Sequence, residues 1–241
     1  MRDQLTDIIH QVTPLFKKIK ITGTETSTKI EAFDDDKILF LVAALKQPVP
    51  EFLGEFGIGS LGLLSGLLNF APYKSEDAHI KVHRNEVADY VSEFEFRDKR
   101  GGFTRYKTMN PRLVEQATVT NIPWNVTVMP TKATIAELTQ LSAHLSEVDT
   151  MFGVKFENKT LFLTIGAGAT STHTSSVAFA TDVEETFSPP SVTYNTKHLL
   201  AVLKNAGPKP SAVRFSEKGI AGITVDSDYG TYNYYLRAKP I

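Results

Sequence analysis

The stretch Thr131–Ile165, TKATIAELTQLSAHLSEVDTMFGVKFENKTLFLTI, shows an order of elements, a helix followed by a hairpin, that recurs in the chain. A threonine at position 131 or 134 can cap a helix, and apolar residues then recur at helical spacing, at Ile135, Leu138, Leu141 and Leu145. The period then becomes two on both sides of Glu157–Asn158–Lys159, which predicts a hairpin. A helix and one hairpin cannot bury their apolar faces alone, so this unit requires partners elsewhere in the chain.

The composition is that of a globular chain with one large domain or two of ordinary size. It has 241 residues, of which 41% are hydrophobic and 22% are charged. No apolar run approaches the roughly 20 residues of a membrane span, and the amino terminus has no signal-peptide pattern. The absence of cysteine excludes disulfides, thiolate metal sites and a cysteine nucleophile, and it fits an intracellular protein.

The formal net charge of −1 argues against a uniformly basic nucleic-acid coat protein. It leaves open a chain that is basic on one surface and acidic on another.

The first half predicts two helices among antiparallel strands. Residues 2–18 have one apolar face, and Pro14 is placed to kink or end the helix. Residues 29–45 read as a hairpin. The second helix is expected at 59–70, GSLGLLSGLLNF, where glycines lower the propensity so that packing must hold it. Three further strands are expected at 79–83, 90–96 and 103–106.

Three patterns in this half invite a ligand-binding interpretation. The run Asp34–Asp35–Asp36 lacks neighbours that complete a metal site, and a solvated turn is favoured. The G-x-G-x-x-G pattern at 57–62 follows a loop-like segment and has no βαβ unit around it, so we reject a dinucleotide site. His79 and His83 lack a third zinc ligand, so we interpret them as exposed histidines.

The second half repeats the order of the first. After the opening helix and hairpin, strands are expected at 176–180 and 192–194, then a helix at 195–207 that Gly207 ends, and further strands at 211–215, 220–225 and 231–238. Residues 107–123 have weak periodicity and two prolines, as in a linker. The prediction is an α+β chain of two similar domains, each with two helices packed on antiparallel sheet: residues 1–110, a connector at 111–124, and residues 125–241.

Catalytic motifs are missing from the chain. It contains no G-x-S-x-G elbow, no H-E-x-x-H and no P-loop. We therefore predict a protein that is not an enzyme and has no catalytic residue, no cofactor and no metal. An enzyme whose site is assembled from distant carboxylates is the alternative.

Four segments resemble DNA sliding clamps, the processivity factors of replication. They are Asn121–Ile122–Pro123 leading into VTVMPTKATIAELTQLSAHL, FGVKF at 152–156, YYLRAKP at 234–240, and GEFGIGSLGLLSGLL at 54–68. The chain resembles the clamps of T-even-type bacteriophages and, more distantly, the proliferating-cell nuclear antigen. The segment at 54–68 favours a phage clamp. Bacterial beta clamps have three domains per chain and dimerise, whereas two-domain chains of this size make trimers.

The resemblance implies a homotrimeric ring with sheets outside and helices around a hole that holds duplex DNA. Basic positions on the helices would then face phosphates, at Arg2, His10, Lys17, Lys132, Lys197 and Lys204. The second helix has no charge at all, and Glu137 and Glu147 offset Lys132. A ring that holds DNA by topology needs only a few mobile lysines.

The resemblance also implies partners. A short carboxyl-terminal peptide of a DNA polymerase would enter an apolar pocket between the domains, lined by Ile38, Ile122, Pro123, Tyr235, Leu236 and Pro240. A separate ATP-dependent clamp loader would open the ring, and a virus-encoded clamp would work in the host-cell cytoplasm. The alternative is a β-rich ring-forming structural or assembly protein of a virus that does not encircle DNA.

Overall fold

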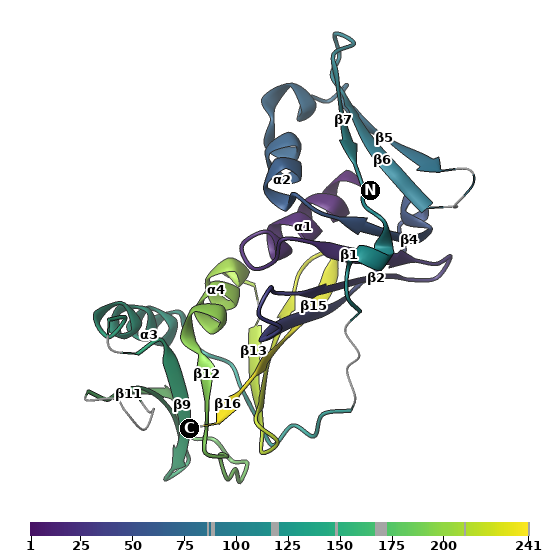
Figure 1. Cartoon of the computed structure of the whole chain (residues 1–241). Coiled ribbons are helices and arrows are strands. Elements are labelled where there is room, and N and C mark those ends of the chain that lie inside the picture. The colour runs from purple at the N-terminus through teal and green to yellow at the C-terminus, as the bar shows by residue number, and fades with distance from the viewer. Residues whose placement is uncertain are drawn as a thin grey trace. The chain divides into compact units, whose positions relative to one another are not determined.

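The computed structural model describes residues 1–85, 87, 90–116, 121–147, 149–166, 173–209 and 211–240. The chain divides into two compact units, Met1–Thr118 with Ser227–Tyr232, and Val119–Asp226 with Asn233–Ile241. Each unit contains two helices and antiparallel sheet (Figure 1), which confirms the predicted α+β class. The domain limits 1–110, 111–124 and 125–241 stay a prediction, and positions 117–120 of the connector lie outside the described residues.

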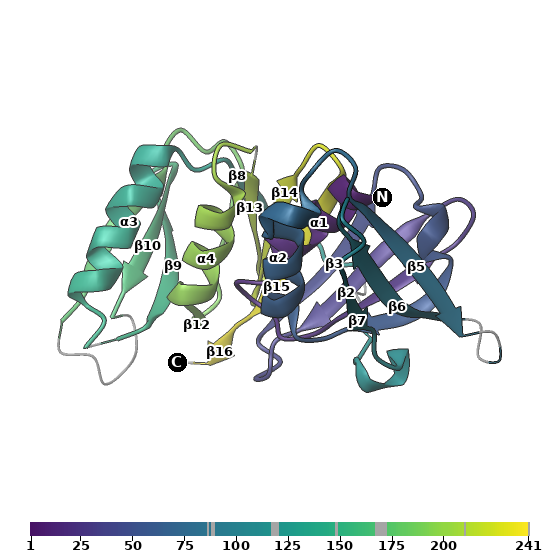
Figure 2. The same ribbon diagram turned by 90° about the horizontal axis from the view of Figure 1, so that it is seen from above.

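The first unit has helices α1 (Arg2–Val12) and α2 (Leu61–Asn69), which pack against each other (Figure 2). The strands of this unit follow one another in the orders β4-β1-β2-β3-β15, part of an eight-stranded sheet, and β5-β6-β7. The bounds are β1 Ile19–Gly23, β2 Thr28–Phe33, β3 Leu39–Leu45, β4 Gly54–Ile58, β5 His79–Asn85, β6 Tyr90–Arg97, β7 Phe103–Lys107 and β15 Gly230–Arg237, with single 3-10 turns at Pro50–Phe52, Ala71–Tyr73 and Pro111–Leu113. Only Gly230–Tyr232 of β15 belong to this unit.

The predicted helix at residues 2–18 is shorter in the structure, where α1 ends at Val12. Pro14 explains the difference, because a proline has no N–H to continue the helical hydrogen bonds. Thr13 still donates its backbone N–H to Ile9 O, and the chain then turns away. Lys17 therefore lies beyond the helix on which it was expected.

The strand β4 directly precedes the glycine pattern at 57–62, so the expected loop at that point is wrong. It pairs antiparallel with β1, with Ile19 opposite Ile58. The rejection of a dinucleotide site still holds, because that site needs a parallel βαβ unit. Leu61, Leu64 and Leu68 of α2 are buried as the helical spacing predicts.

The second unit has helices α3 (Lys132–His144) and α4 (Thr196–Ala206), which lie side by side over β9 and β12 (Figures 1 and 2). The strands of this unit follow one another in the orders β11-β10-β9-β12-β16 and β15-β14-β13-β8, the latter part of the eight-stranded sheet. The bounds are β8 Val126–Val128, β9 Met151–Glu157, β10 Thr160–Ile165, β11 Ser175–Ala180, β12 Val192–Asn195, β13 Ser211–Ser216, β14 Ile220–Asp226 and β16 Lys239–Pro240.

The opening helix and hairpin of this unit match the sequence pattern. Thr131 caps α3 by accepting the backbone N–H of Thr134 at 3.1 Å. Glu157 pairs with Thr160, so the loop between β9 and β10 is Asn158–Lys159, and both residues have positive φ. That geometry is the type I′ turn that suits the twist of a hairpin.

Candidate functional site

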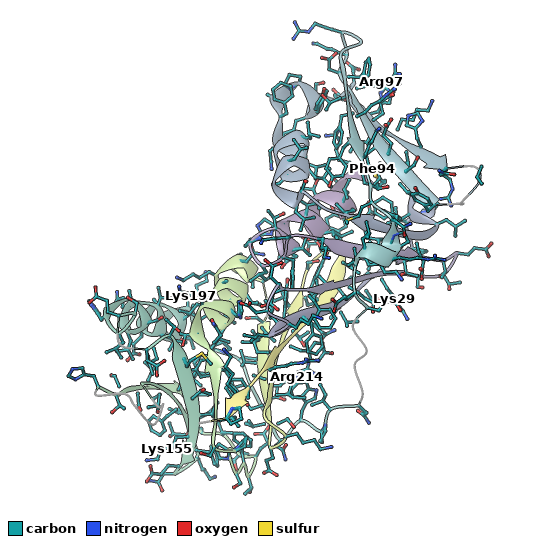
Figure 3. All side chains as sticks on the ribbon, in the orientation of Figure 1. Lys29, Phe94, Arg97, Lys155, Lys197 and Arg214 are labelled. Atoms are coloured by element: carbon teal, nitrogen blue, oxygen red, sulfur yellow. The ribbon has the colours of Figure 1, made fainter. Side chains whose placement is uncertain are left out.

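The helices of the second unit present three of the six predicted DNA-facing residues. Lys132 is exposed at the first position of α3, and Lys197 and Lys204 are exposed on α4 (Figure 3 labels Lys197). Residues seven apart lie on one face of a helix, so the two α4 lysines share a face. Glu137 and Glu147 are also exposed. The basic charge is therefore concentrated on α4.

The first unit places its three predicted residues in different surroundings. His10 is exposed in the last turn of α1. Lys17 forms an ion pair with Asp35 in the aspartate turn, which raises the pKa of the lysine. Both Nη nitrogens of Arg2 are buried without a hydrogen-bond partner among the described residues, and this burial lowers the pKa of its guanidinium. Of these three residues, only His10 is exposed on α1.

Helix α2 has an apolar outer surface. Leu63 and Phe70 are 59% and 52% exposed, and a Cβ added at Gly62 or Gly66 would meet nothing within 4 Å. A groove of about 450 Å³ runs between this helix and Thr104 of β7. Exposed apolar side chains therefore line this groove.

The early part of the predicted connector is fastened to the first unit. Val114 is buried at 4% exposure. Lys18 Nζ donates to Leu113 O at 2.7 Å, and Lys37 forms an ion pair with Glu115 at 2.9 Å. The described residues 111–116 therefore follow the surface of this unit.

The last part of the connector is fastened to the second unit by an indole. Trp124 lies between Arg214 of β13 and Tyr235 of β15, above Gly222 of β14. The Cζ atom of Arg214 is 4.6 Å from the Trp124 ring centroid, and the Tyr235 ring centroid is 6.3 Å away at an interplanar angle of 23°. Burial raises the pKa of the Tyr235 hydroxyl, and the charge of Arg214 opposes the shift. We call Trp124, Arg214, Gly222 and Tyr235 the tryptophan cluster.

Sequence reasoning missed three of these four residues. The available signal was that the only tryptophan of the chain directly follows Pro123 at the end of a linker. Arg214 and Gly222 carried no signal, because strand pairing alone brings them opposite each other.

The predicted peptide-binding residues are placed unequally. Ile122 is half-buried and Pro123 exposed beside the tryptophan cluster, and Pro240 is exposed in β16, opposite Val192. Leu236 is 0% exposed, so its side chain supports the core of the second unit and forms no surface. Its neighbour Tyr235 faces the other side of the sheet, as strand alternation requires. Ile38 is half-buried in the first unit.

The sheet of β5, β6 and β7 contains a charged cluster around a buried carboxylate. Glu95 has 0% exposure, and it accepts hydrogen bonds from Arg97 Nε and, at 2.9 Å, from Arg105 Nε. The hydrogen bond from Arg97, followed by that from Arg105, lowers the pKa of Glu95 to about 2 against the opposing effect of burial.

His83, Glu93 and Glu95 bring ligand atoms within 4.8 Å of one another, as in a metal site. The two arginines already use both oxygens of Glu95 and repel a cation, so this cluster is an ion-pair network. His83 is half-buried rather than exposed as the sequence pattern indicated.

The three-aspartate turn is also explained by hydrogen bonds within the protein. Asp34 Oδ1 accepts the backbone N–H groups of Ile38 and Leu39 at 2.8 and 2.9 Å. Lys37 has a φ of 56°, which fits a tight turn. This arrangement is the solvated turn that was favoured from the sequence.

The structure matches the crystal structure of PCNA, the proliferating-cell nuclear antigen, from Thermococcus kodakaraensis with a TM-score of 0.72, over 99% of this chain and 97% of that one. The chain has the PCNA sliding-clamp fold. The two sequences are only 10% identical, so the likeness concerns the fold. No protein-family model and no curated protein sequence matches the chain. Among the described residues, no helix of the PCNA-like units has the length and apolarity to cross a membrane.

Proposed function

We propose that this chain is a DNA sliding clamp, a processivity factor that encircles duplex DNA and tethers a DNA polymerase. The observation that carries the proposal is the match to a PCNA over almost the full length of both chains. Such a protein acts by topology and binding and is not an enzyme. We place it inside the cell, in the host cytoplasm for a clamp of the T-even phage type that the segment at 54–68 resembles.

The exposed lysines on the helices of the second unit support the DNA-binding part of the proposal. Lys132, Lys197 and Lys204 are in reach of solvent and belong to helices that cover one face of a sheet. Flexible ammonium groups attract phosphates without fixing a sequence or a position, so the ring can slide. Few such contacts are needed when closure of the ring prevents escape.

Unpaired sheet edges support closure into a homotrimer. In the first unit, β7 is the edge of its sheet, lies beside α2 and carries Phe103, which is 55% exposed. In the second unit, β11 is the edge of its sheet and lies beside α3. Exposed edges invite pairing, and head-to-tail pairing of β7 with β11 of another copy produces a closed ring if the rotation fits.

Charge also favours this pairing of edges. The exposed Lys107 lies on β7, whereas Asp182 and Glu185 follow β11 and are exposed. Complementary charge steers association and disfavours pairing of like edges. The partner peptide of the polymerase and the separate ATP-dependent clamp loader complete the proposed set of partners.

Two measurements test the proposal together. Light scattering should give three times the 26.7 kDa mass of one chain, at concentrations high enough to overcome weak association. After loading, the protein should stay on nicked circular DNA in high salt and leave when the DNA is linearised. A stable trimer that is never retained on circles would favour the virion-type ring instead, and a strict monomer would exclude both.

A further inference from the structure

The chain contains a single tryptophan, and its position on the sheet is specific. A Cβ atom added at Gly222 would lie 2.5 Å from Trp124 Cη2 and 2.9 Å from Cζ2. Real Cβ atoms do not approach so closely, so any other residue at position 222 displaces the ring. The indole edge therefore rests directly on the backbone of β14.

Hydrogen bonds within the sheet hold Arg214, the residue that lies over the indole ring. Arg214 Nη2 donates to Thr224 Oγ1 at 2.6 Å and to Asn233 Oδ1 at 3.3 Å, and the Thr224 hydroxyl donates to Asn233 Oδ1 at 2.8 Å. This network orients the guanidinium over the face of Trp124, where a cation–π interaction stabilises it. These hydrogen bonds join residues of the strands only, so the position of Arg214 does not depend on the connector.

The chain on the two sides of Trp124 differs in its attachment to the sheet. Asn125, the next residue, is bound to the sheet, because its N–H donates to Phe215 O at 3.0 Å and its Oδ1 accepts the N–H of Glu217 at 2.9 Å. The preceding residues 121–123 belong to no helix or strand. Trp124 therefore attaches the end of the connector to the sheet, one residue before the hydrogen bonds of Asn125.

We propose that Trp124 is a positioning residue that locks the end of the connector onto the sheet and so presents Ile122 and Pro123 to a partner peptide. This inference rests on the proposed clamp function, because that function supplies the peptide. The lock itself is a property of the free protein. It is measurable with no partner present.

The lock is tested by the fluorescence of the single tryptophan in the intact protein. Gly222→Ala should expel the ring, which shifts its emission to longer wavelength and increases quenching by acrylamide. Arg214→Met should produce a smaller change of the same kind, because it removes only the cation. Gly66→Ala, where a new Cβ meets nothing within 4 Å, is the matched glycine control and should change neither reading. Unchanged emission in folded Gly222→Ala would overturn the lock.

The positioning role is tested with a synthetic peptide of the carboxyl-terminal residues of the replicative polymerase from the same genome. Trp124→Ala and Gly222→Ala should each weaken binding by roughly three- to thirty-fold, the range expected from losing a cation–π contact and its packing. Trp124→Phe should recover part of the affinity, and light scattering should show unchanged assembly in every variant. Equal or tighter binding by Trp124→Ala would overturn the positioning role.

A third outcome separates this inference from the proposed function. If the wild-type protein does not bind the peptide at all, the polymerase-tethering function fails and the positioning role fails with it. The fluorescence of Gly222→Ala then still decides whether the lock exists.

Discussion

Asp7 joins the amino-terminal helix to the last turn of the chain within the first unit. Its Oδ2 atom accepts hydrogen bonds from Ser227 Oγ at 2.7 Å and from Tyr232 Oη at 2.8 Å, and Asp7 is 8% exposed. Asp7→Ala removes the acceptor that these two buried hydroxyls share. Ser227 Oγ keeps Gly230 O as an acceptor at 3.0 Å, and the loss of buried hydrogen bonds here costs about 1–3 kcal/mol. We expect this variant to lower the free energy of unfolding of the first unit by that order.

The readout is hydrogen exchange of the α1 amides, because a two-unit chain need not unfold in one step. Asp228→Asn, an exposed change in the same turn, is the control and should stay within about 0.5 kcal/mol of wild type. Equal protection of α1 in Asp7→Ala and Asp228→Asn would show that the two hydroxyls find other acceptors.

Glu95 makes the stability of the first unit depend on pH below about 4.5. Its pKa is lowered from about 4.5 to about 2 in the folded protein by the Arg97 and Arg105 hydrogen bonds. A depressed pKa adds stability that is fully present above the unfolded pKa near 4.5 and is lost as the pH falls toward 2. Wild type should therefore be more stable than Glu95→Gln at pH 6, and the difference should shrink between pH 4.5 and pH 2. Urea unfolding at several pH values measures it, and a constant difference would contradict the assignment.

Local patterns predicted individual residues well where neighbours in sequence determine the outcome. The Thr131 cap, the helix end at Gly207 and the buried leucines of α2 follow from spacing and from residue type. The tryptophan cluster and the hydrogen bonds of Asp7 join positions that are far apart in the chain, and only the pairing of strands brings them together. Lys17 was expected on the first helix because the sequence did not decide whether Pro14 kinks that helix or ends it.

At the scale of elements, α4 carries two of the exposed lysines, Lys197 and Lys204, that we propose contact DNA. Reversing two charges, in Lys197→Glu with Lys204→Glu, should shorten retention on nicked circular DNA. It should also reduce the slope of log affinity against log salt concentration by about 2, one for each lost phosphate contact. The matched control is Lys29→Glu with Lys155→Glu, an equal change of charge on β2 and β9, where both lysines are exposed (Figure 3).

Equal loss in the two double variants would mean that total charge, and not α4, governs DNA binding. The comparison requires that both variants form the same assembly as wild type, which light scattering establishes beforehand.

The turn between β9 and β10 gives a second prediction for an element. Asn158 and Lys159 have φ angles of 50° and 58°, and a type I′ turn prefers glycine at the second of these positions. Lys159→Gly should stabilise the second unit by about 0.5 to 1 kcal/mol, because it relieves the left-handed conformation of a residue with a side chain. The lost Lys159–Glu184 ion pair is exposed and contributes little. A lower melting temperature for this variant would contradict the prediction.

The short strands were the elements that the sequence did not reveal. β1 and β4 have five residues each, and their burial patterns lack the alternation that marks a half-exposed strand. Prolines and glycines before β4 favoured a loop, whereas its pairing with β1 decides the structure. Tertiary context overrides local preference most easily in such short segments.

For the whole molecule, the order of elements was more informative than any motif. Two helices and antiparallel strands recur in both halves, and the fold matches a PCNA although only 10% of residues are identical. Many sequences satisfy the same pattern of buried positions, so the fold persists when its residues change. The predicted peptide-binding residues included the fully buried Leu236, because a short motif match does not tell which face of a strand a residue occupies.

Closure of the ring is the prediction that belongs to the assembled molecule. The chain has no cysteine, so Lys107→Cys on β7 and Ala178→Cys on β11, both exposed positions, introduce the only two thiols. A bifunctional maleimide should join β7 of one copy to β11 of the next. Because a head-to-tail interface closes only at a fixed number of copies, cross-linked species should stop at three chains.

The single variants are the controls, because a β7–β11 contact then has a thiol on one side only, and neither variant should be cross-linked. Adding Phe103→Glu to the double variant should abolish cross-linking, since it places a negative charge where an exposed ring would be covered, facing the acidic residues that follow β11. A ladder that continues beyond three chains would indicate an open filament. Cross-linked trimers formed on nicked circular DNA should stay on it through denaturant and leave after linearisation, since a closed covalent ring can be lost only from a free end.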